Sequence, residues 1–201
     1  MVPPSHNSFP PEQQKLLKDI KKGGSQQRKL KKAAEFLKSD PKFMLAATRM
    51  NEKALRFVAE ELKHNYDFML AAVKLRGMAL EWGATKLRTN RDIVLAAAQQ
   101  NGYSLQFTSK ELQEDKQIVL AAVSQCGFAL EFASSNLQKD HAVCLAACKQ
   151  EGEALEFVAV DAAGRRDIEL AAVKQSAHAL EFASNGIKND KHVMLAAVKQ
   201  L

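Results

Sequence analysis

The sequence has few cysteines, no long apolar run and no phosphate-binding loop. Three cysteines in 201 residues are too few for a disulfide scaffold, so a reducing, cytoplasmic compartment is expected. The longest apolar runs are of the MLAAV type, far below the roughly 20 residues of a membrane-spanning helix. The first residues, Met1 to Ser5, lack the apolar core of a secretory signal, and no GxxxxGK[ST] segment occurs. We therefore expect a soluble protein without a transmembrane segment.

The net charge of +6 is concentrated near the N-terminus. Residues 1–39 contain nine basic and three acidic residues, whereas residues 40–201 contain 20 of each. Contact with nucleic acid or with an anionic surface is therefore expected from the first segment. The basic cluster at its centre consists of Arg28, Lys29, Lys31 and Lys32.

Composition and periodicity divide the chain into three parts. Residues 1–11 are rich in proline and are expected to form a flexible leader. Residues 12–39 are expected to form a basic helical arm or cap, with a helix over 11–22 and a degenerate repeat helix over 26–37. Residues 40–201 contain six and a half copies of one repeat.

The repeat has a period of 25 residues without insertions. Its first mark is a Leu-Ala-Ala triplet that begins at Leu45, Leu70, Leu95, Leu120, Leu145, Leu170 and Leu195. A second leucine follows ten residues later, and an aromatic residue lies two further on, at Phe57, Trp82, Phe107, Phe132, Phe157 and Phe182. Fixed self-similarity at this period is typical of stacked helical repeats.

The residue pattern of each repeat predicts two short helices. Asp or Asn precedes the first helix in every copy but one, where Arg165 stands, and both residue types are good N-caps. Pro41 suits a first helical position. Gly77, Gly102, Gly127 or Gly152 is expected to end the first helix as a left-handed C-terminal cap. An amphipathic second helix is expected to follow each glycine.

The columns of the repeat also predict packing. The first helix is apolar nearly all round and should be the buried layer, while the second should expose residues such as Lys53 and Glu60 to water. The aromatic column is interpreted as core, and the glutamate column as solvated or paired within its helix. The fifth copy departs from the pattern over 161–165, so a looser joint is predicted there, and Glu169 stands in an otherwise apolar column. We expect an all-α protein, an α-solenoid or superhelix of tandem helix-turn-helix repeats.

Stretches such as 116–140 and 166–190 resemble a family of short helical repeats catalogued as a domain of unknown function, from bacterial, algal and protist proteins. The resemblance covers residues 40–201. It implies an all-α repeat protein and no particular activity, cofactor or substrate.

No residue pattern indicates catalysis. Four of the five histidines lie in variable columns and the fifth, His6, lies in the leader, so no catalytic residue and no cofactor are predicted. His141, Cys144 and Cys148 share one helix with helical spacing, and Cys126 ends the preceding first helix, which together could form a zinc site. Because Val, Met and Ala mostly fill the columns of Cys144 and Cys148, we interpret them as core and predict no metal.

A basic column closes the first helix of most repeats. Positive residues there complement the helix C-terminus, and the alternative is a ligand-facing stripe. The column consists of Arg49, Lys74, Lys149, Lys174 and Lys199, interrupted by Gln99 and Ser124.

The leading hypothesis for function is a non-enzymatic scaffold that binds another protein or peptide. The alternative is nucleic-acid or anionic-surface contact through the basic N-terminal arm. A structural part in a larger assembly is a third hypothesis, because Leu201 follows a first helix without its second. The apolar flank left there is expected to pack on a partner or on further repeats.

Overall fold

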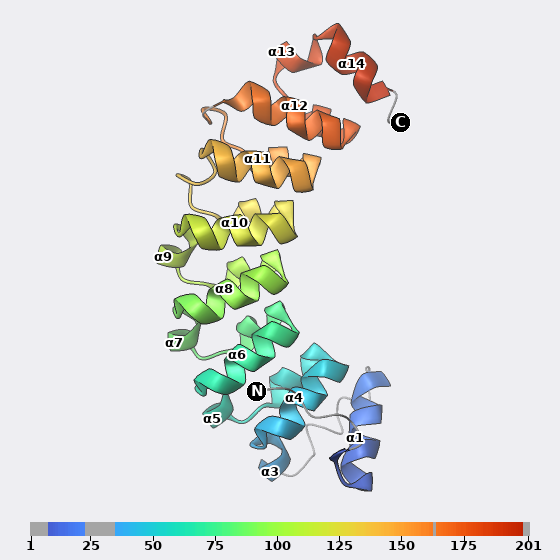
Figure 1. Cartoon of the computed structure of the whole chain (residues 1–201), viewed down its shortest axis with the longest axis vertical. Helices are drawn as coiled ribbons and strands as arrows, with labels where there is room; N and C mark the ends of the chain where they lie inside the picture. Colours follow the sequence, from blue (N-terminus) through green and yellow to red (C-terminus); the bar gives the residue numbers. More distant parts are fainter. Residues whose placement is uncertain (1–7, 23–34, 163, 199–201) are drawn as a thin grey trace. The chain divides into compact units, whose positions relative to one another are not determined.

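The computed structural model describes residues 8–22, 35–162 and 164–198 (Figure 1). These residues form helices and turns, and no strand occurs among them. The chain folds as two compact units, Met1–Gln100 and Asn101–Leu201. Each unit stacks copies of the predicted repeat, so the protein has the predicted all-α architecture of the solenoid class.

Unit 1 contains seven α-helices and two 3-10 helices, written η, among its described residues. In chain order the elements are α1 (Pro11–Lys22), α3 (Glu35–Lys38), α4 (Pro41–Met50), η3 (Glu52–Phe57), α5 (Glu60–Lys63), α6 (Tyr66–Leu75), η4 (Gly77–Trp82), α7 (Thr85–Arg88) and α8 (Arg91–Gln100).

Unit 2 follows a similar order of elements. They are η5 (Gly102–Phe107), α9 (Lys110–Gln113), α10 (Lys116–Gln125), η6 (Gly127–Phe132), α11 (His141–Gln150), η7 (Gly152–Phe157), α12 (Arg165–Gln175), η8 (Ala177–Phe182), α13 (Asn185–Lys188) and α14 (Lys191–Val198). Turns stand in place of the short α-helix after η6 and η7.

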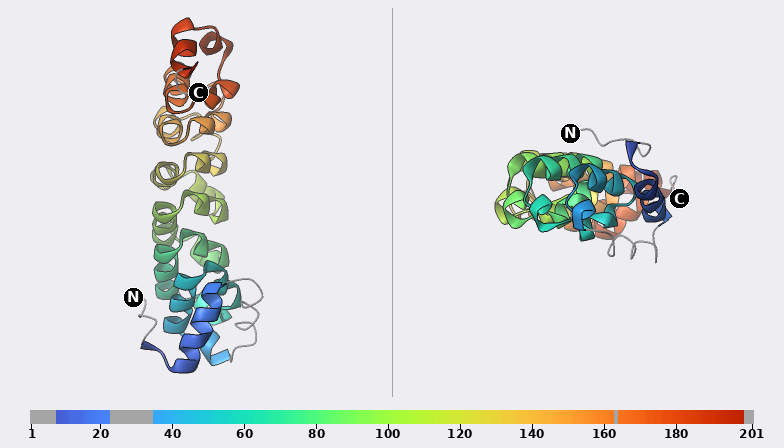
Figure 2. Two further views of the ribbon diagram at one scale, coloured as in Figure 1. Left: turned by 90° about the vertical axis from the view of Figure 1, so that its right-hand side faces the viewer. Right: turned by 90° about the horizontal axis from the view of Figure 1, so that it is seen from below.

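Within each unit the elements form two layers, visible as two columns of helices in Figure 2. One layer consists of the first helices, in which α4, α6 and α8 pack in sequence in unit 1, as α10, α11, α12 and α14 do in unit 2. The other layer consists of the 3-10 helices, where η3 contacts η4, and η5 to η8 contact one another in order.

The predicted N-caps are confirmed wherever their side-chain bonds are resolved. The Asp40 carboxylate accepts from the Lys42 amide at 2.9 Å, and the Asn65 side chain accepts from the Phe68 amide at 2.9 Å. The structure corrects the prediction for the copy in which Arg165 stands at the N-cap position. The helix begins at Arg165 itself, and its N-cap is Gly164, whose φ of 63° is the left-handed conformation that glycine tolerates best.

The predicted second helix is wrong as a single element. After the first helix the backbone turns directly into a six-residue 3-10 helix, and a separate short α-helix or turn follows two residues later. Gln113 shows how the two pieces are held together in the third copy, because its buried Nε2 donates to the Leu105 carbonyl at 3.1 Å. The predicted exposure of Lys53 and Glu60 is confirmed.

The glycine prediction is also wrong in its mechanism. The repeat glycines begin the 3-10 helices, and the only positive φ among the described residues belongs to Gly164. Glycine is needed instead because neighbouring repeats approach closely. A Cβ added at Gly127 would lie 2.5 Å from the Ala147 carbonyl oxygen of the next first helix, and one at Gly152 would lie equally close to that of Ala172.

The core lies between the layers and within the row of first helices, as the apolar columns predict. Phe43, Phe68 and Ile93 are almost fully buried on successive first helices of unit 1, and so are Ile118 and Val143 in unit 2. The aromatic column is different. All six of its members are half-buried rather than core, which corrects the prediction and places their rings at the edge of the 3-10 layer.

Two residues of α12 that depart from the repeat pattern, Arg165 and Glu169, form an ion pair. The Arg165 Nε lies 3.0 Å from the Glu169 carboxylate, whose side chain is 3% exposed. Glu169 also accepts from the amide of Ser184 at 2.9 Å and from its hydroxyl at 2.8 Å, while Arg165 donates to the Val158 and Ala159 carbonyls. Arg165 therefore belongs to a network of partly buried polar contacts, and the looser joint over 161–165 stays a prediction.

Helix α1 covers α4 at the start of unit 1. Its bounds agree with the predicted helix, and Leu17 and Ile20 are fully buried. The Asn51 side chain donates to the Ile20 carbonyl at 3.4 Å, and the Phe9 ring meets Phe43 edge to face at 5.9 Å. Of the predicted repeat helix over 26–37, residues 26–34 lie outside the described residues, as do residues 1–7 of the predicted leader.

Candidate binding surface on the 3-10 helices

The predicted basic column is exposed but lies at helix ends. Arg49, Lys74, Lys149 and Lys174 lie in the last turns of α4, α6, α11 and α12, where a positive charge stabilises a helix by roughly 0.3–1 kcal/mol. Their use in binding stays a prediction. The remaining predicted binding residues, Lys199, Arg28, Lys29, Lys31 and Lys32, lie outside the described residues.

The structure does not gather the cysteines and His141 into a metal site. No three His, Cys, Asp or Glu side chains of the described residues are close enough to share an ion. Burial raises the pKa of Cys144 to about 11 and that of Cys148 to about 12, so both stay protonated at neutral pH. Cys126 instead lies at the start of η6, where its thiol is 3.4 Å from the Glu151 carboxylate. Because zinc binds thiolates, this environment favours the core interpretation.

The last described helix, α14, presents apolar side chains to solvent. Leu195 is 63% and Val198 62% exposed, whereas Cys148 and Val123, the copies of Val198 two and three repeats earlier, are fully buried. That a partner or further repeats cover this flank stays a prediction.

The geometry of the 3-10 helix creates a second surface. With three residues per turn, side chains three apart eclipse one another, so the second and fifth residues of each six-residue helix share a side. We name these residues the η face. They are Lys53 and Arg56, Met78 and Glu81, Tyr103 and Gln106, Phe128 and Glu131, Glu153 and Glu156, and His178 and Glu181.

The η face is accessible, and its chemistry differs from copy to copy. None of its twelve residues is buried, and the predicted solvation of the glutamate column is confirmed. The third and fourth residues of the same helices are Ala or Ser followed by Leu, and all are buried except the half-buried Leu180. Packing therefore fixes one side of each 3-10 helix and leaves the other free to vary.

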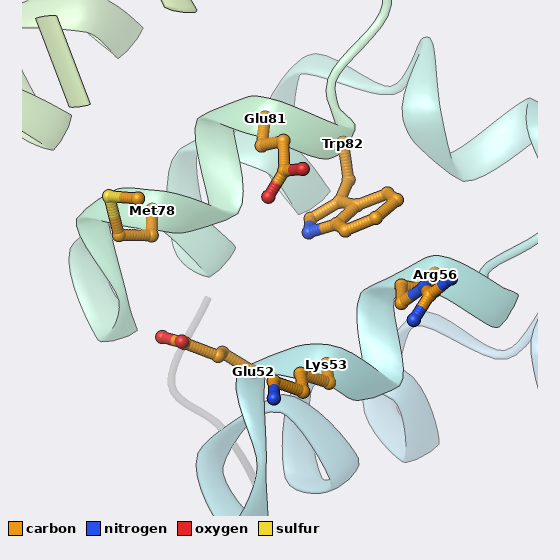
Figure 3. Close-up of a pocket in the computed structure, with 6 residues that line it drawn as sticks. All are labelled: Glu52, Lys53, Arg56, Met78, Glu81 and Trp82. Carbon is orange, nitrogen blue, oxygen red and sulfur yellow. The ribbon is translucent and has the colours of Figure 1, made fainter. Parts of the chain in front are cut away.

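In unit 1 the η face borders a recess of about 330 Å³ between η3 and η4 (Figure 3). The Arg56 guanidinium lies 5.9 Å from the centre of the Trp82 ring, a cation–π arrangement. Figure 3 shows this pair at one end of the recess and Met78 with Glu52 at the other. The recess therefore combines the side chains of Met78 and Trp82 with charges of both signs. Its lining residues are Glu52, Lys53, Arg56, Met78, Glu81 and Trp82.

In unit 2 the same aromatic column meets different partners. The Tyr103 ring packs on Phe132 at 6.3 Å, and the Phe128 ring packs on Phe157 at 6.4 Å, both edge to face. In each case a side chain of one 3-10 helix contacts the ring of the next. Phe182, in the last copy, has no such partner among the described residues.

The electrostatics of the two units also differ. Unit 1 has 19 basic and 10 acidic residues, a net charge of +9, whereas unit 2 has 10 basic and 13 acidic residues, a net charge of −3. On the η face of unit 2 the carboxylates of Glu131, Glu156 and Glu181 are exposed, and none forms an ion pair with a described residue. This surface could not be predicted from a single second helix, because residues three apart eclipse one another in a 3-10 helix and not in an α-helix. The sequence feature that indicates this surface is the pair of variable columns on either side of each buried Ala-Leu pair.

Comparison with known proteins identifies the repeat. A family described as Domain of unknown function (DUF4116) matches the chain four times, over residues 40–82, 65–113, 115–161 and 165–200. No curated protein and no solved structure matches the chain. None of the described helices is long and apolar enough to cross a membrane.

Proposed function

This chain belongs to the DUF4116 family of helical repeats, and we propose that it acts as a non-enzymatic scaffold that binds another protein or peptide. The observation that carries the proposal is the contrast within each 3-10 helix. The buried Ala-Leu pair repeats, while the exposed residues of the same helix change from basic to apolar to acidic. Repeat arrays use such variable surface columns to build extended binding faces.

The recess between η3 and η4 supports the proposal with a specific shape. Its volume of about 330 Å³ is at the lower end of ligand pockets, so it suits one large side chain of a partner. Trp82 offers an aromatic surface, and Trp is enriched among residues that dominate binding energy at interfaces. Charges of both signs around the ring, from Arg56 and Glu81, would orient a polar group on the partner.

The test is a selection of peptides from a random displayed library against the full chain, followed by affinity measurement. One variant removes three charges of the η face: Lys53→Ala, Glu81→Ala and Glu156→Ala. Its control removes the same charges from other exposed positions: Lys42→Ala, Asp92→Ala and Glu114→Ala. We expect selected peptides with a micromolar Kd to bind the η-face variant at least about tenfold more weakly than the control, a difference of about 1.4 kcal/mol. Selected peptides that bind both variants equally, or a library without binders, would refute the proposal.

A second candidate function is contact with polyanions through α1. The buried Leu17 and Ile20 hold one side of α1 on α4, and its lysines, Lys15, Lys18 and Lys22, are exposed at helical spacing on another side. The buried apolar residues are not available to enter a bilayer, so we favour nucleic-acid phosphates as the partner.

This candidate is tested in the full chain, because removing α1 would uncover α4. We expect the variant Lys15→Gln, Lys18→Gln, Lys22→Gln to bind single-stranded RNA several-fold more weakly than the parent at about 50 mM salt, with a shallower salt dependence up to about 200 mM. RNA binding that is equal in the two proteins would exclude α1 as the contact.

A further inference from the structure

Phe182 of unit 2 belongs to the aromatic column and has no ring or cation partner among the described residues. In three other copies the ring of a 3-10 helix meets a side chain from the η face of the preceding one, at Trp82, Phe132 and Phe157. In unit 1 the fifth residue, Arg56, supplies a cation to Trp82. In unit 2 the second residue supplies a ring to Phe132 and to Phe157. For Phe182 the corresponding second and fifth residues of η7 are Glu153 and Glu156.

A half-buried ring that follows two carboxylates suits a cation from outside the chain. Glu153 is held in place, because it accepts from the Ser176 hydroxyl at 2.7 Å and lies 3.9 Å from the His178 ring nitrogen. Glu156 and Glu181 are exposed and form no ion pair with a described residue. The Arg56–Trp82 contact is an example, within the same protein, of a guanidinium on this aromatic column.

The acidic column extends this position into a row. Glu131, Glu156 and Glu181 are the fifth residues of η6, η7 and η8, which contact one another in order within unit 2. Packed helices lie about 8–10 Å apart, and a chain in the polyproline II conformation has three residues per turn and advances about 3.1 Å per residue. Every third residue of such an extended peptide lies on the same side and would therefore meet one carboxylate.

We propose that the η face of η6 to η8 binds an extended basic peptide with arginine or lysine at every third position. The three basic side chains pair with Glu131, Glu156 and Glu181, and one of them also lies on the Phe182 ring. The inference rests on the proposed scaffold function, and it adds the chemical class and the spacing of the partner. The charge of unit 2, −3, favours such a peptide, and the same charge opposes a nucleic acid on this surface.

The experiment measures fluorescence anisotropy of short labelled peptides with the full chain at about 50 mM salt, where exposed ion pairs are weakly screened. The probe has three arginines, one at every third position, in a glycine-serine background. Its control has the same composition with the three arginines adjacent.

The protein variants separate the row from the rest of unit 2. The test variant is Glu131→Gln, Glu156→Gln, Glu181→Gln. The matched control removes three exposed carboxylates elsewhere: Glu111→Gln, Glu114→Gln, Asp167→Asn. A third variant, Phe182→Leu, removes the ring and keeps an apolar side chain. Thermal melting of each variant establishes that it is folded.

We expect the spaced peptide to bind the parent and the control variant alike, and the test variant about tenfold more weakly, because three exposed ion pairs are lost. Phe182→Leu should weaken binding about two- to fivefold through the lost cation–π contact. Equal affinity for the parent and the test variant, or for the spaced and adjacent peptides, overturns the inference. If library-selected peptides bind through the η face while the spaced basic peptide does not bind, this inference fails and the scaffold function stands.

Discussion

The row of first helices and the row of 3-10 helices come from the same 25-residue repeat, yet they differ in what their side chains do. The first helices bury nearly the same residues in each copy, such as Ile118 and Val143. The 3-10 helices keep one buried side and present Lys53, Phe128 or His178 at one and the same position on the other. The difference teaches that packing constrains the first row, while the η face is available for recognition.

The largest effect on stability is expected at Glu169, a carboxylate in a column that is apolar in the other first helices. Removing this buried carboxylate in Glu169→Met leaves the Arg165 guanidinium without its partner, which costs about 3–5 kcal/mol. The double variant Arg165→Asp, Glu169→Met restores the residue types of the other copies and should recover most or all of the loss. Urea unfolding of the two variants measures both values. A double variant as unstable as the single one would mean that the ion pair is not what joins this copy to its neighbours.

A somewhat smaller loss is expected for Gly127→Ala, which tests the close approach of the two rows. The new Cβ would lie 2.5 Å from a backbone carbonyl oxygen that cannot move without its helix, and such overpacking costs about 1–3 kcal/mol. Gly186→Ala in α13 is the control, because its nearest neighbour is the Ser184 hydroxyl at 3.8 Å. Thermal melting should show a clear decrease for the first variant and none for the second. Equal melting temperatures would contradict the steric explanation.

A third, smaller effect concerns Asp140, which caps α11 and pairs with Lys116 of the preceding first helix at 2.7 Å. Asp140→Asn keeps a capping side chain and loses the ion pair, so it should cost less than about 1 kcal/mol near pH 7. The hydrogen bond from Lys116 lowers the pKa of Asp140 in the folded protein. The contribution is therefore complete above the unfolded pKa of about 3.9 and disappears as the pH falls through the lower folded value.

Urea unfolding at neutral pH and at about pH 3 measures this dependence. The difference in stability between the parent and Asp140→Asn should shrink at the acidic pH. A difference that grows there would show that the pairing does not stabilise the charged carboxylate.

The smallest effect on stability is expected on the η face itself. Arg56→Gln removes an exposed cation from the Trp82 ring, and the free energy of unfolding should change by less than about 1 kcal/mol. Trp82 is the only tryptophan of the chain, so its fluorescence reports directly on the recess. Acrylamide should quench Trp82 more strongly in the variant, because the guanidinium no longer covers the ring. Unchanged quenching together with a large loss of stability would place Arg56 in the packing rather than on the binding surface.

Much of the fold could be predicted from periodicity, because burial repeats with the sequence. The last alanine of the Leu-Ala-Ala triplet is buried in every copy and located the buried row, whereas the leucine of the triplet is half-buried or exposed in every copy after the first. Asp or Asn marked the start of most first helices. The 3-10 helices could not be predicted, since their boundaries depend on contact with the next repeat. Gly127 illustrates this, because its requirement comes from a carbonyl oxygen 20 residues further along the chain.

The candidate site was harder to predict from the sequence than the fold, for a related reason. Whether Phe132 or Phe182 is core or half-buried depends on which side of a 3-10 helix faces the neighbouring row. A helix with 3.6 residues per turn would place these rings on another side. Likewise, Arg165 and Glu169 were each visible as an exception, but only their spatial pairing explains both.

The central claim is that the first helices form the packed core while the 3-10 helices bind the partner. Hydrogen exchange of the full chain, with and without a saturating library-selected peptide, tests this claim most directly. We expect the peptide to slow amide exchange in the 3-10 helices, at segments such as Gly127–Phe132 and Gly152–Phe157, and to leave exchange in the first helices unchanged. Protection confined to the first helices, with unchanged exchange in the 3-10 helices, would contradict the claim.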